Sequence, residues 1–401
     1  MSATNDQNSL AAPALLLISA VSGFILSNSP LAVIYNELLS TPMALKLGSW
    51  EVINKSIILL INDGMMAIFF LFIGLELKRE VVVGELSNPR QAMLPIFAAV
   101  GGMVVPALIY FAFNAMGEAR NGWGVPMATD IAFALGILAV LGSRVPTSLK
   151  VLLTAVAIVD DLGAIFVIAF FYTSQIDTTS LFSAFVFFSL CITANRLGVM
   201  KVSVYMLLGI PLWYFMLKSG VHATIAGVLL ATTIPLAPKS QNRAKLISDI
   251  FSKEASPLDS PAVFLEKSLI KWIGFLIVPL FAFSNAGVSL SSVSFSGITW
   301  GIVLGLVLGK PIGIVGAAYC AKIFGVADLP KGVHWRQMLG ISFLAGIGFT
   351  MSLFISSLAF VSDAMNNEAK LAILMGSLLA GVLGIVLLVK HKPEERSIGE
   401  V

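Results

Sequence analysis

The chain has 401 residues, of which 57% are hydrophobic and 12% are charged, and its formal net charge is +3 at pH 7. Soluble proteins have roughly 45–50% hydrophobic and about 25% charged residues, so a soluble fold could not hide this much apolar surface. The two cysteines, Cys191 and Cys320, lie in apolar stretches and exclude a disulfide framework or a cysteine metal site. The composition therefore indicates a membrane protein.

Apolar runs of about 20 residues, the length that crosses the hydrocarbon core, recur along the whole chain. In lipid such runs must be helical, because every backbone polar group has to be satisfied within the segment. We therefore predict an all-α polytopic fold with twelve transmembrane helices. They are expected to begin near Leu10, Ser56, Ala92, Gly124, Thr147, Leu181, Val202, Gly220, Ser268, Ile298, Gln337 and Lys370.

A single transmembrane domain is expected over residues 1–401, with eight spans within 10–237 and four within 268–390. The first apolar run, Leu10 to Asn28, lacks the Lys or Arg that opens a signal peptide, so it is expected to be a retained span. Residues 238–261, rich in Ser, Lys, Asp and Pro, have the composition of a soluble linker. The segment Ser40 to Lys55 is the other sizeable loop, where a short hairpin is compatible with the sequence and a homodimer contact is left open.

Lys and Arg are distributed unevenly between alternate loops. Most of them fall in the even-numbered loops and the C-terminal tail, which lie on the same side as the N-terminal segment, and few fall in the odd-numbered loops. By the positive-inside rule, both termini and the 238–261 linker are expected in the cytoplasm. The positive net charge is thus explained by topology, and no basic patch with interleaved aromatic residues suggests a nucleic acid partner.

The fourth span contains a charge beside a helix-breaking residue. Asp130 lies in the run Val125 to Ile131, where Pro126 removes a backbone donor and Thr129 offers a hydroxyl next to the carboxylate. Broken helices at membrane depth are tolerated only where the break is buried within the protein or lines a water-filled cavity. An interruption of this span is therefore expected at Pro126.

Asp160 and Asp161 stand side by side in the fifth span, within the apolar run Val151 to Phe171. A charge at the bilayer centre costs about 2.5–3.5 kcal/mol on insertion scales, and such residues usually line an ion or substrate path. The pair is therefore interpreted as cation or proton ligands. The alternatives are a salt-bridged structural pair, or a soluble active site mistaken for a membrane segment.

Lys310 is the buried cation of the tenth span, in a row with Gly305, Gly309 and Gly313 that would let helices approach closely. Together with the three aspartates it would cost roughly 10–14 kcal/mol uncompensated, which predicts a shared hydrated cavity. A role as a structural counter-ion is left open and is compatible with function. A nucleotide P-loop is rejected, because the glycine spacing is one residue short and Pro311 follows the lysine.

The eleventh span contains two glycines beside a threonine, in the run Ala345 to Met351. Gly346 and Gly348 weaken the helix at membrane depth, as in transporters that expose backbone to an ion. Spans three to five and ten to twelve start on opposite sides of the membrane, and the middle span of each trio is the interrupted one. This arrangement predicts an inverted repeat with interrupted spans four and eleven.

Six stretches now resemble one known family. They are Ala128 to Gly136, Ala157 to Gly163, Lys218 to Thr224, Pro279 to Gly287, Gly309 to Pro311 and Gly346 to Thr350. In this order they are similar to the bacterial NhaA-type sodium/proton antiporters, over about residues 10 to 390. The resemblance implies a multi-pass protein of the inner membrane that exchanges cytoplasmic sodium or lithium for external protons, electrogenically and under pH control, without a cofactor and without enzyme activity.

The resemblance also implies roles for single residues. Asp161 would be the principal sodium or lithium ligand with Asp160 as its partner, while Asp130 and Thr129 would line the crossing of the broken helices. Lys310 would pair with Asp160 and offset helix dipoles. A group tied to pH activation would comprise Glu76, Lys78, Arg79, Glu80, His222 and Glu266, for which a solvated collar at the membrane boundary is the alternative.

Lys267 and Ile270 stand where well-characterised relatives carry histidines, so the resemblance implies no particular activating pH for this chain. Three other functions compete with antiport. A simple channel would have no use for a buried lysine that faces carboxylates. A sodium-coupled solute symporter would use similar spans and would show substrate-dependent sodium uptake. An intramembrane aspartyl protease would carry its aspartates on different helices with a Gly-x-Gly-Asp element, which the sequence lacks.

Overall fold

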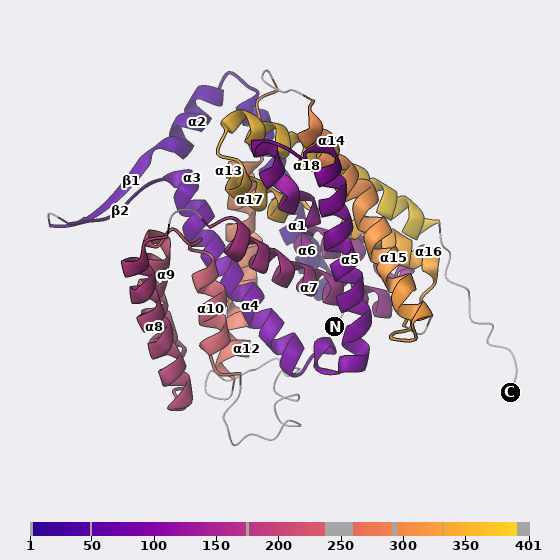
Figure 1. Cartoon of the computed structure of the whole chain (residues 1–401), viewed down its shortest axis with the longest axis horizontal. Helices are drawn as coiled ribbons and strands as arrows, with labels where there is room; N and C mark the ends of the chain where they lie inside the picture. Colours follow the sequence, from indigo (N-terminus) through magenta and orange to yellow (C-terminus); the bar gives the residue numbers. More distant parts are fainter. Residues whose placement is uncertain are drawn as a thin grey trace, which may run out of the picture.

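The computed structural model describes residues 3–48, 50–173, 176–236, 260–290, 295–330 and 332–390. The linker predicted at 238–261 lies outside these ranges except for its last two residues. The described chain is almost entirely helical, which confirms the all-α polytopic class (Figure 1). The exception is an antiparallel hairpin of β1 (Pro42–Leu47) and β2 (Trp50–Ser56), which projects from the helical body at the upper left.

The helices before the linker are α1 (Ala3–Ser27), α2 (Ala32–Ser40), α3 (Ile57–Leu60), α4 (Met66–Val82), α5 (Pro89–Phe113), α6 (Ile131–Leu141), α7 (Thr147–Phe171), α8 (Thr178–Arg196), α9 (Val202–Lys218) and α10 (Ile225–Thr233). Those after it are α12 (Pro261–Trp272), α13 (Val278–Asn285), α14 (Gly297–Leu304), α15 (Lys310–Ile323), α16 (Trp335–Ala345), α17 (Phe349–Ala359) and α18 (Asp363–Val389). Wider π-helical turns form η1 (Ile61–Met65), η5 (Ile273–Ile277) and η7 (Gly305–Gly309), and tighter 3₁₀ turns form η2 (Glu85–Ser87), η3 (Glu118–Met127) and η4 (Gly142–Arg144).

Seven helices of the described chain are long and apolar enough to cross a membrane, and there are up to nine when each of two bent pairs counts as one span. One bent pair is α1 with α2, at 112°, and the other is α16 with α17, at 46°. Two further segments are short for a crossing of about 20 residues: α9 has 17 residues and α10 has 9. The structure thus shows a polytopic membrane protein.

Buried apolar side chains form two clusters. The larger one joins α1, α4 to α7 and α13 to α18, and the smaller one joins α4 with α8, α9, α10 and α12. Large apolar side chains also remain on the outside, such as Phe170 at 75% exposure and Leu378 at 69%. These exposed side chains are expected in lipid, since the hydrocarbon is as apolar as the core.

Helices α5 and α15 pack very closely against each other beside Lys310. A Cβ added to Gly101 would lie 2.2 Å from the carbonyl oxygen of Gly313, and a Cβ on Gly309 would lie 2.9 Å from the Cα of Pro106. The prediction that the glycine row permits close approach is therefore confirmed. The contact places Lys310, which is 0% exposed, at the first turn of α15 against α5.

Candidate ion site

The candidate site includes the point at which the fourth predicted span is interrupted. The 3₁₀ helix η3 ends at Met127, Ala128 is extended with φ −80° and ψ 151°, and α6 begins at Ile131. Asp130 caps α6, because its Oδ1 accepts a hydrogen bond of 2.9 Å from the backbone N–H of Phe133. A carboxylate at a helix N-terminus is stabilised by the dipole and by the otherwise unpaired N–H groups.

A second break lies between α16 and α17, at residues 346–348. Small residues are required there, because a Cβ on Gly346 would lie 2.4 Å from the carbonyl oxygen of Leu306. The backbone N–H of Phe349, at the start of α17, donates to Ser377 Oγ at 3.1 Å. The neighbouring helix α18 therefore supplies one of the hydrogen bonds that the break removes.

The two breaks cross and hydrogen-bond to each other. The backbone N–H of Asp130 donates to the carbonyl of Ile347 at 2.7 Å, and the N–H of Thr350 donates to Asp130 Oδ2 at 3.1 Å. The hydroxyl of Thr350 donates to the same oxygen. The N-termini of α6 and α17 thus converge on one carboxylate, whose negative charge offsets both positive helix ends.

Asp160, Lys310 and Thr129 form a buried polar group beside this crossing. Lys310 Nζ forms an ion pair with Asp160 Oδ2 and donates to Thr129 Oγ1 at 2.9 Å. The Thr129 hydroxyl lies 2.6 Å from Asp160 Oδ2 and 2.8 Å from the carbonyl oxygen of Ala345, both of which are acceptors for its single proton. The lysine charge therefore lies close to the C-terminal carbonyls of α16, where a cation is favoured.

Asp161 differs from its neighbour. Its side chain is 2% exposed, and its Oδ1 has no hydrogen-bond partner among the described residues. Asp160 Oδ1 is likewise without a partner there. A buried oxygen without a donor costs free energy, and an ionised carboxylate costs more unless it is paired. Asp161 can meet this requirement by holding a proton or by binding a cation.

The charges at the far end of α4 form a separate ion-pair network around Arg79. Its Nε lies 3.0 Å from Glu266 Oε1 and its Nη1 lies 2.5 Å from Glu80 Oε1, while Nη2 is 3.9 Å from Glu76 Oε1. The Arg79 side chain is 23% exposed and that of Glu266 is 8% exposed. This network joins α4 to α12. It places the Arg79 guanidinium among three carboxylates whose side chains are only partly exposed to solvent.

Lys78 and His222 were predicted to belong to the pH-activation group with Arg79, but their hydrogen bonds lie outside the Arg79 network. Lys78 Nζ donates to the carbonyls of Thr232 at 2.8 Å and Ile234 at 2.5 Å, so it caps the C-terminus of α10. His222 precedes the start of α10, and its Nε2 lies 2.7 Å from the carbonyl oxygen of Tyr172. Because α10 has 9 residues, His222 is separated from the Arg79 network by the length of that helix, about 14 Å at 1.5 Å per residue.

Three groups that form hydrogen bonds at the crossing of the two chain breaks were not predicted from the sequence. They are the Thr350 side chain, the carbonyl of Ala345 and the Ser377 hydroxyl. Thr350 belongs to the run Ala345 to Met351, which had been singled out for its glycines. A backbone carbonyl and a serine from another helix gave no sequence signal, because their contact depends on how α16, α17 and α18 pack.

Comparison with known proteins identifies the family of the chain. The family described as Na+/H+ antiporter 1 matches residues 5–388. The chain belongs to that family. Similar proteins include the Na(+)/H(+) antiporter NhaA of Pseudomonas fluorescens strain Pf0-1, 49% identical over 377 residues that cover 92% of this chain and 91% of the relative. The Na(+)/H(+) antiporter NhaA of Rhodospirillum rubrum is 48% identical over 390 residues, which cover 94% of each chain.

Proposed function

We propose that this member of the Na+/H+ antiporter 1 family is a transporter that exchanges cytoplasmic sodium or lithium for external protons. The observation that carries the proposal is the buried Asp161 oxygen, which has no hydrogen-bond partner among the described residues and lies beside the Asp160–Lys310 pair at the crossing of two chain breaks. Relatives that bear the antiporter name and cover more than nine-tenths of the chain support it.

The chemistry of exchange follows from competition for the two carboxylates. Two ionised carboxylates about 6 Å apart repel by roughly 2–3 kcal/mol at an effective dielectric near 20, so one proton or one cation must be held there. Sodium and lithium are small, hard ions that favour oxygen ligands, which Asp160, Asp161 and the Thr129 hydroxyl supply. At high cytoplasmic pH the cation wins the site, and protons displace it on the outer side.

In this proposal, Lys310 makes the exchange electrogenic. Sodium binding at Asp160 competes with the Lys310 ion pair, so the lysine proton and the sodium ion are linked. Two protonatable groups, Asp161 and Lys310, then act against one sodium ion, and each cycle moves net charge. Exchange is therefore expected to respond to membrane potential, at about 2.3 kcal/mol per elementary charge per 100 mV.

Vesicle transport tests the proposed exchange directly. Purified protein in proteoliposomes that hold a proton gradient should release protons when a sodium or lithium salt is diluted into the medium, as read by a pH dye. Potassium should give no response. Sodium movement that requires an organic solute would instead identify a symporter, and sodium currents that are independent of the proton gradient would identify a channel.

We further propose twelve membrane crossings with cytoplasmic termini in the bacterial inner membrane. They comprise the seven long helices, the two bent pairs, and the segments α9, α10 and α12 to α13. Spans three to five and ten to twelve would form the inverted repeat, and each middle span contains one of the two crossing breaks. The bias of Lys and Arg toward alternate loops supports the orientation.

Cysteine labelling tests the orientation. In a background with Cys191→Ser and Cys320→Ser, we expect Met116→Cys to react with an impermeant thiol reagent only from outside the cell. Leu197→Cys should react only from the cytoplasmic side, and both positions are well exposed, at 88% and 77%. Labelling of both positions from one side would contradict the proposed span count, because Met116 and Leu197 would then share a compartment.

The Arg79 network is proposed to set the pH at which exchange begins. Arg79→Gln removes the guanidinium that forms ion pairs with Glu76, Glu80 and Glu266, so these carboxylates should hold protons up to a higher pH. If activation follows loss of those protons, the activation profile should move toward alkaline pH by about one unit or more. The measurement is exchange rate against pH in proteoliposomes.

Arg90→Gln provides the matched control for Arg79→Gln. Arg90 is exposed in the first turn of α5, and its backbone N–H, which accounts for its capping contact with Asn88, is retained in the variant. This variant loses the same charge near the same membrane boundary and should keep the parent profile. Equal profiles for all three proteins would assign the Arg79 network to structure alone.

A further inference from the structure

A cavity of about 640 Å³ lies between α5, η3 and α7, and none of the residues assigned to the ion site lines it. Its lining residues are Met103, Val104, Ala107, Leu108, Phe111, Arg120, Asn121, Trp123, Met127, Val167, Phe171 and Tyr172. None of them is acidic, so this cavity offers a cation no carboxylate ligand. The transport mechanism proposed above makes no use of it.

One side of the cavity is open to the lipid-facing surface. Val104 is 49% exposed, Leu108 61% and Phe171 66%, and all three lie on helices long enough to span the membrane. From Met103 to Phe111 the wall follows α5 for nine residues, a rise of about 12 Å at 1.5 Å per residue. The cavity is therefore a largely apolar slot that runs along α5, a helix long enough to span the membrane, and its open side bears exposed apolar side chains.

A single cation lies at one end of this slot. Arg120 is exposed, and its guanidinium carbon lies 5.8 Å from the centroid of the Phe111 ring. The described residues place no carboxylate within ion-pair distance of it, although Glu118 is two positions away. A guanidinium at the membrane boundary binds phosphate well, because its N–H groups match two phosphate oxygens.

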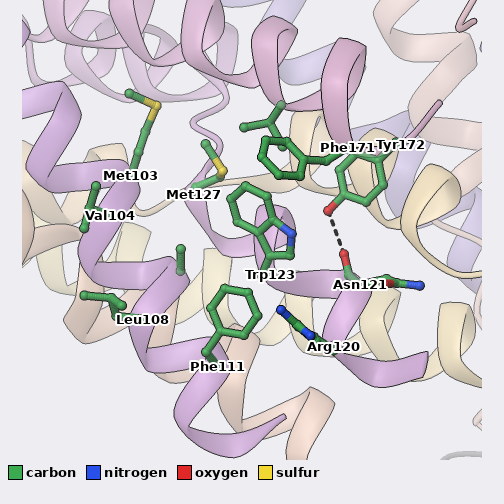
Figure 2. A pocket seen from close by; sticks show the side chains of 12 residues that line it. Met103, Val104, Leu108, Phe111, Arg120, Asn121, Trp123, Met127, Phe171 and Tyr172 are labelled. Atoms are coloured by element: carbon green, nitrogen blue, oxygen red, sulfur yellow. Dashed lines mark hydrogen bonds between the residues drawn. The ribbon is translucent and has the colours of Figure 1, made fainter. Parts of the chain in front are cut away.

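Aromatic side chains mark this end of the slot as the membrane interface. Figure 2 shows Trp123 between Phe111 and Phe171, with Arg120 beside Phe111; the ring centroids of Trp123 lie 6.0 Å from Phe111 and 5.1 Å from Phe171. The Tyr172 hydroxyl donates to the carbonyl of Asn121 at 2.7 Å. Trp and Tyr with an apolar body and a polar tip are enriched at headgroup level.

We propose that this slot binds one anionic phospholipid, with the headgroup phosphate on Arg120 and an acyl chain along α5 toward Met103. The open side toward lipid, the charge at the interface end and the apolar deep end together fit such a molecule. A soluble anion would leave the slot unfilled, and a zwitterionic lipid would gain less from the guanidinium, since its own cation offsets the phosphate.

The deep end of the slot touches the elements that carry the ion site. Met103 packs against α7 at Gly163, where an added Cβ would lie 2.2 Å from the methionine Sδ. Met127, which also lines the slot, is two residues before Thr129. A bound acyl chain would therefore pack against both the helix of Asp160 and the extended segment at the crossing.

Quenching of tryptophan fluorescence by brominated lipid tests the proposal. The full-length protein is reconstituted in phosphatidylcholine vesicles with increasing fractions of acyl-brominated phosphatidylglycerol or acyl-brominated phosphatidylcholine. The chain has 6 Trp residues, so the component that disappears in Trp123→Phe is taken as the signal of the slot. We expect half-quenching of this component at an about fivefold lower fraction of phosphatidylglycerol, the effect of one cation near a headgroup.

Three variants separate charge from shape. Arg120→Gln should bring phosphatidylglycerol to the level of phosphatidylcholine, Arg120→Lys should keep the preference, and Val104→Phe should weaken quenching by both lipids by filling the slot. Arg144→Gln removes an exposed charge elsewhere and should behave as the parent protein. Sodium/proton exchange measured in vesicles of one fixed composition shows that each variant is folded.

Three results would overturn the proposal. Equal half-quenching fractions for the two lipids in the parent protein, or an unchanged preference in Arg120→Gln, would show that Arg120 holds no headgroup. Relief of quenching by soluble glycerol phosphate would show that the guanidinium binds free phosphate groups and that the acyl chain is not part of the ligand.

Discussion

Replacing Asp161 by Asn is expected to abolish sodium-dependent proton movement while the protein remains folded. Asp161 is buried, and its Oδ1 has no partner within the described residues, so no ion pair that holds the fold together is broken by the change. The neutral amide cannot exchange a proton for a cation. Proteoliposome assays with a pH dye should show proton release at the background level of protein-free vesicles.

Thermal unfolding supplies the second readout for Asp161→Asn. Removing a buried ionisable group lowers the cost of desolvation, so the variant should unfold at the same temperature as the parent or higher. Asp177→Asn is the matched control, because Asp177 caps α8 at an exposed position and asparagine caps nearly as well. Exchange at the parent rate by Asp161→Asn would refute the assignment of the ion site.

The second large effect is expected for the Asp160–Lys310 pair. Both side chains are almost fully buried, at 1% and 0% exposure, so Lys310→Gln leaves an uncompensated carboxylate and Asp160→Asn leaves an uncompensated ammonium. Removal of one partner of a buried pair costs about 3–5 kcal/mol. Denaturant unfolding in detergent micelles should show this loss for each single variant.

A double-mutant cycle distinguishes the ion pair from simple loss of packing. The variant with both Lys310→Gln and Asp160→Asn should be more stable than the sum of the two single losses predicts, since neither charge is then left alone. Additive losses would mean that the two side chains do not depend on each other. In transport, Lys310→Gln should respond less than the parent to an imposed potassium-diffusion potential.

Hydropathy predicted the start of some of the helices to within one residue. The predicted start at Thr147 coincides with that of α7, and the start near Ile298 lies one residue from Gly297, where α14 begins. Boundaries were less accurate where polar residues continue a helix past the apolar run. The last span was expected near Lys370, whereas α18 begins at Asp363. Its first two turns include polar residues such as Glu368, which a hydropathy criterion leaves out.

The charged residues of the candidate site were predictable because charge in lipid is costly and therefore conspicuous. The pairing of Asp160 with Lys310 was an implication of the family resemblance, and the structure shows this ion pair. The dispersed pH group was harder to predict. A sequence shows that Lys78 is charged, but not that its ammonium faces the carbonyls at the end of α10 instead of a carboxylate. That distinction depends on the packing of α4 against α10.

The contact between Gly101 and Gly313 has a mechanical consequence. Backbone meets backbone there, so α5 and α15 cannot slide past each other without a clash between main-chain atoms. The two helices should therefore move together as one rigid unit, with Lys310 held at the first turn of α15. Flexing must then be taken up by segments such as 128–130 and 346–348, where the chain leaves the α-helical path. The cation site would open by a shift of those hinges against a stationary lysine.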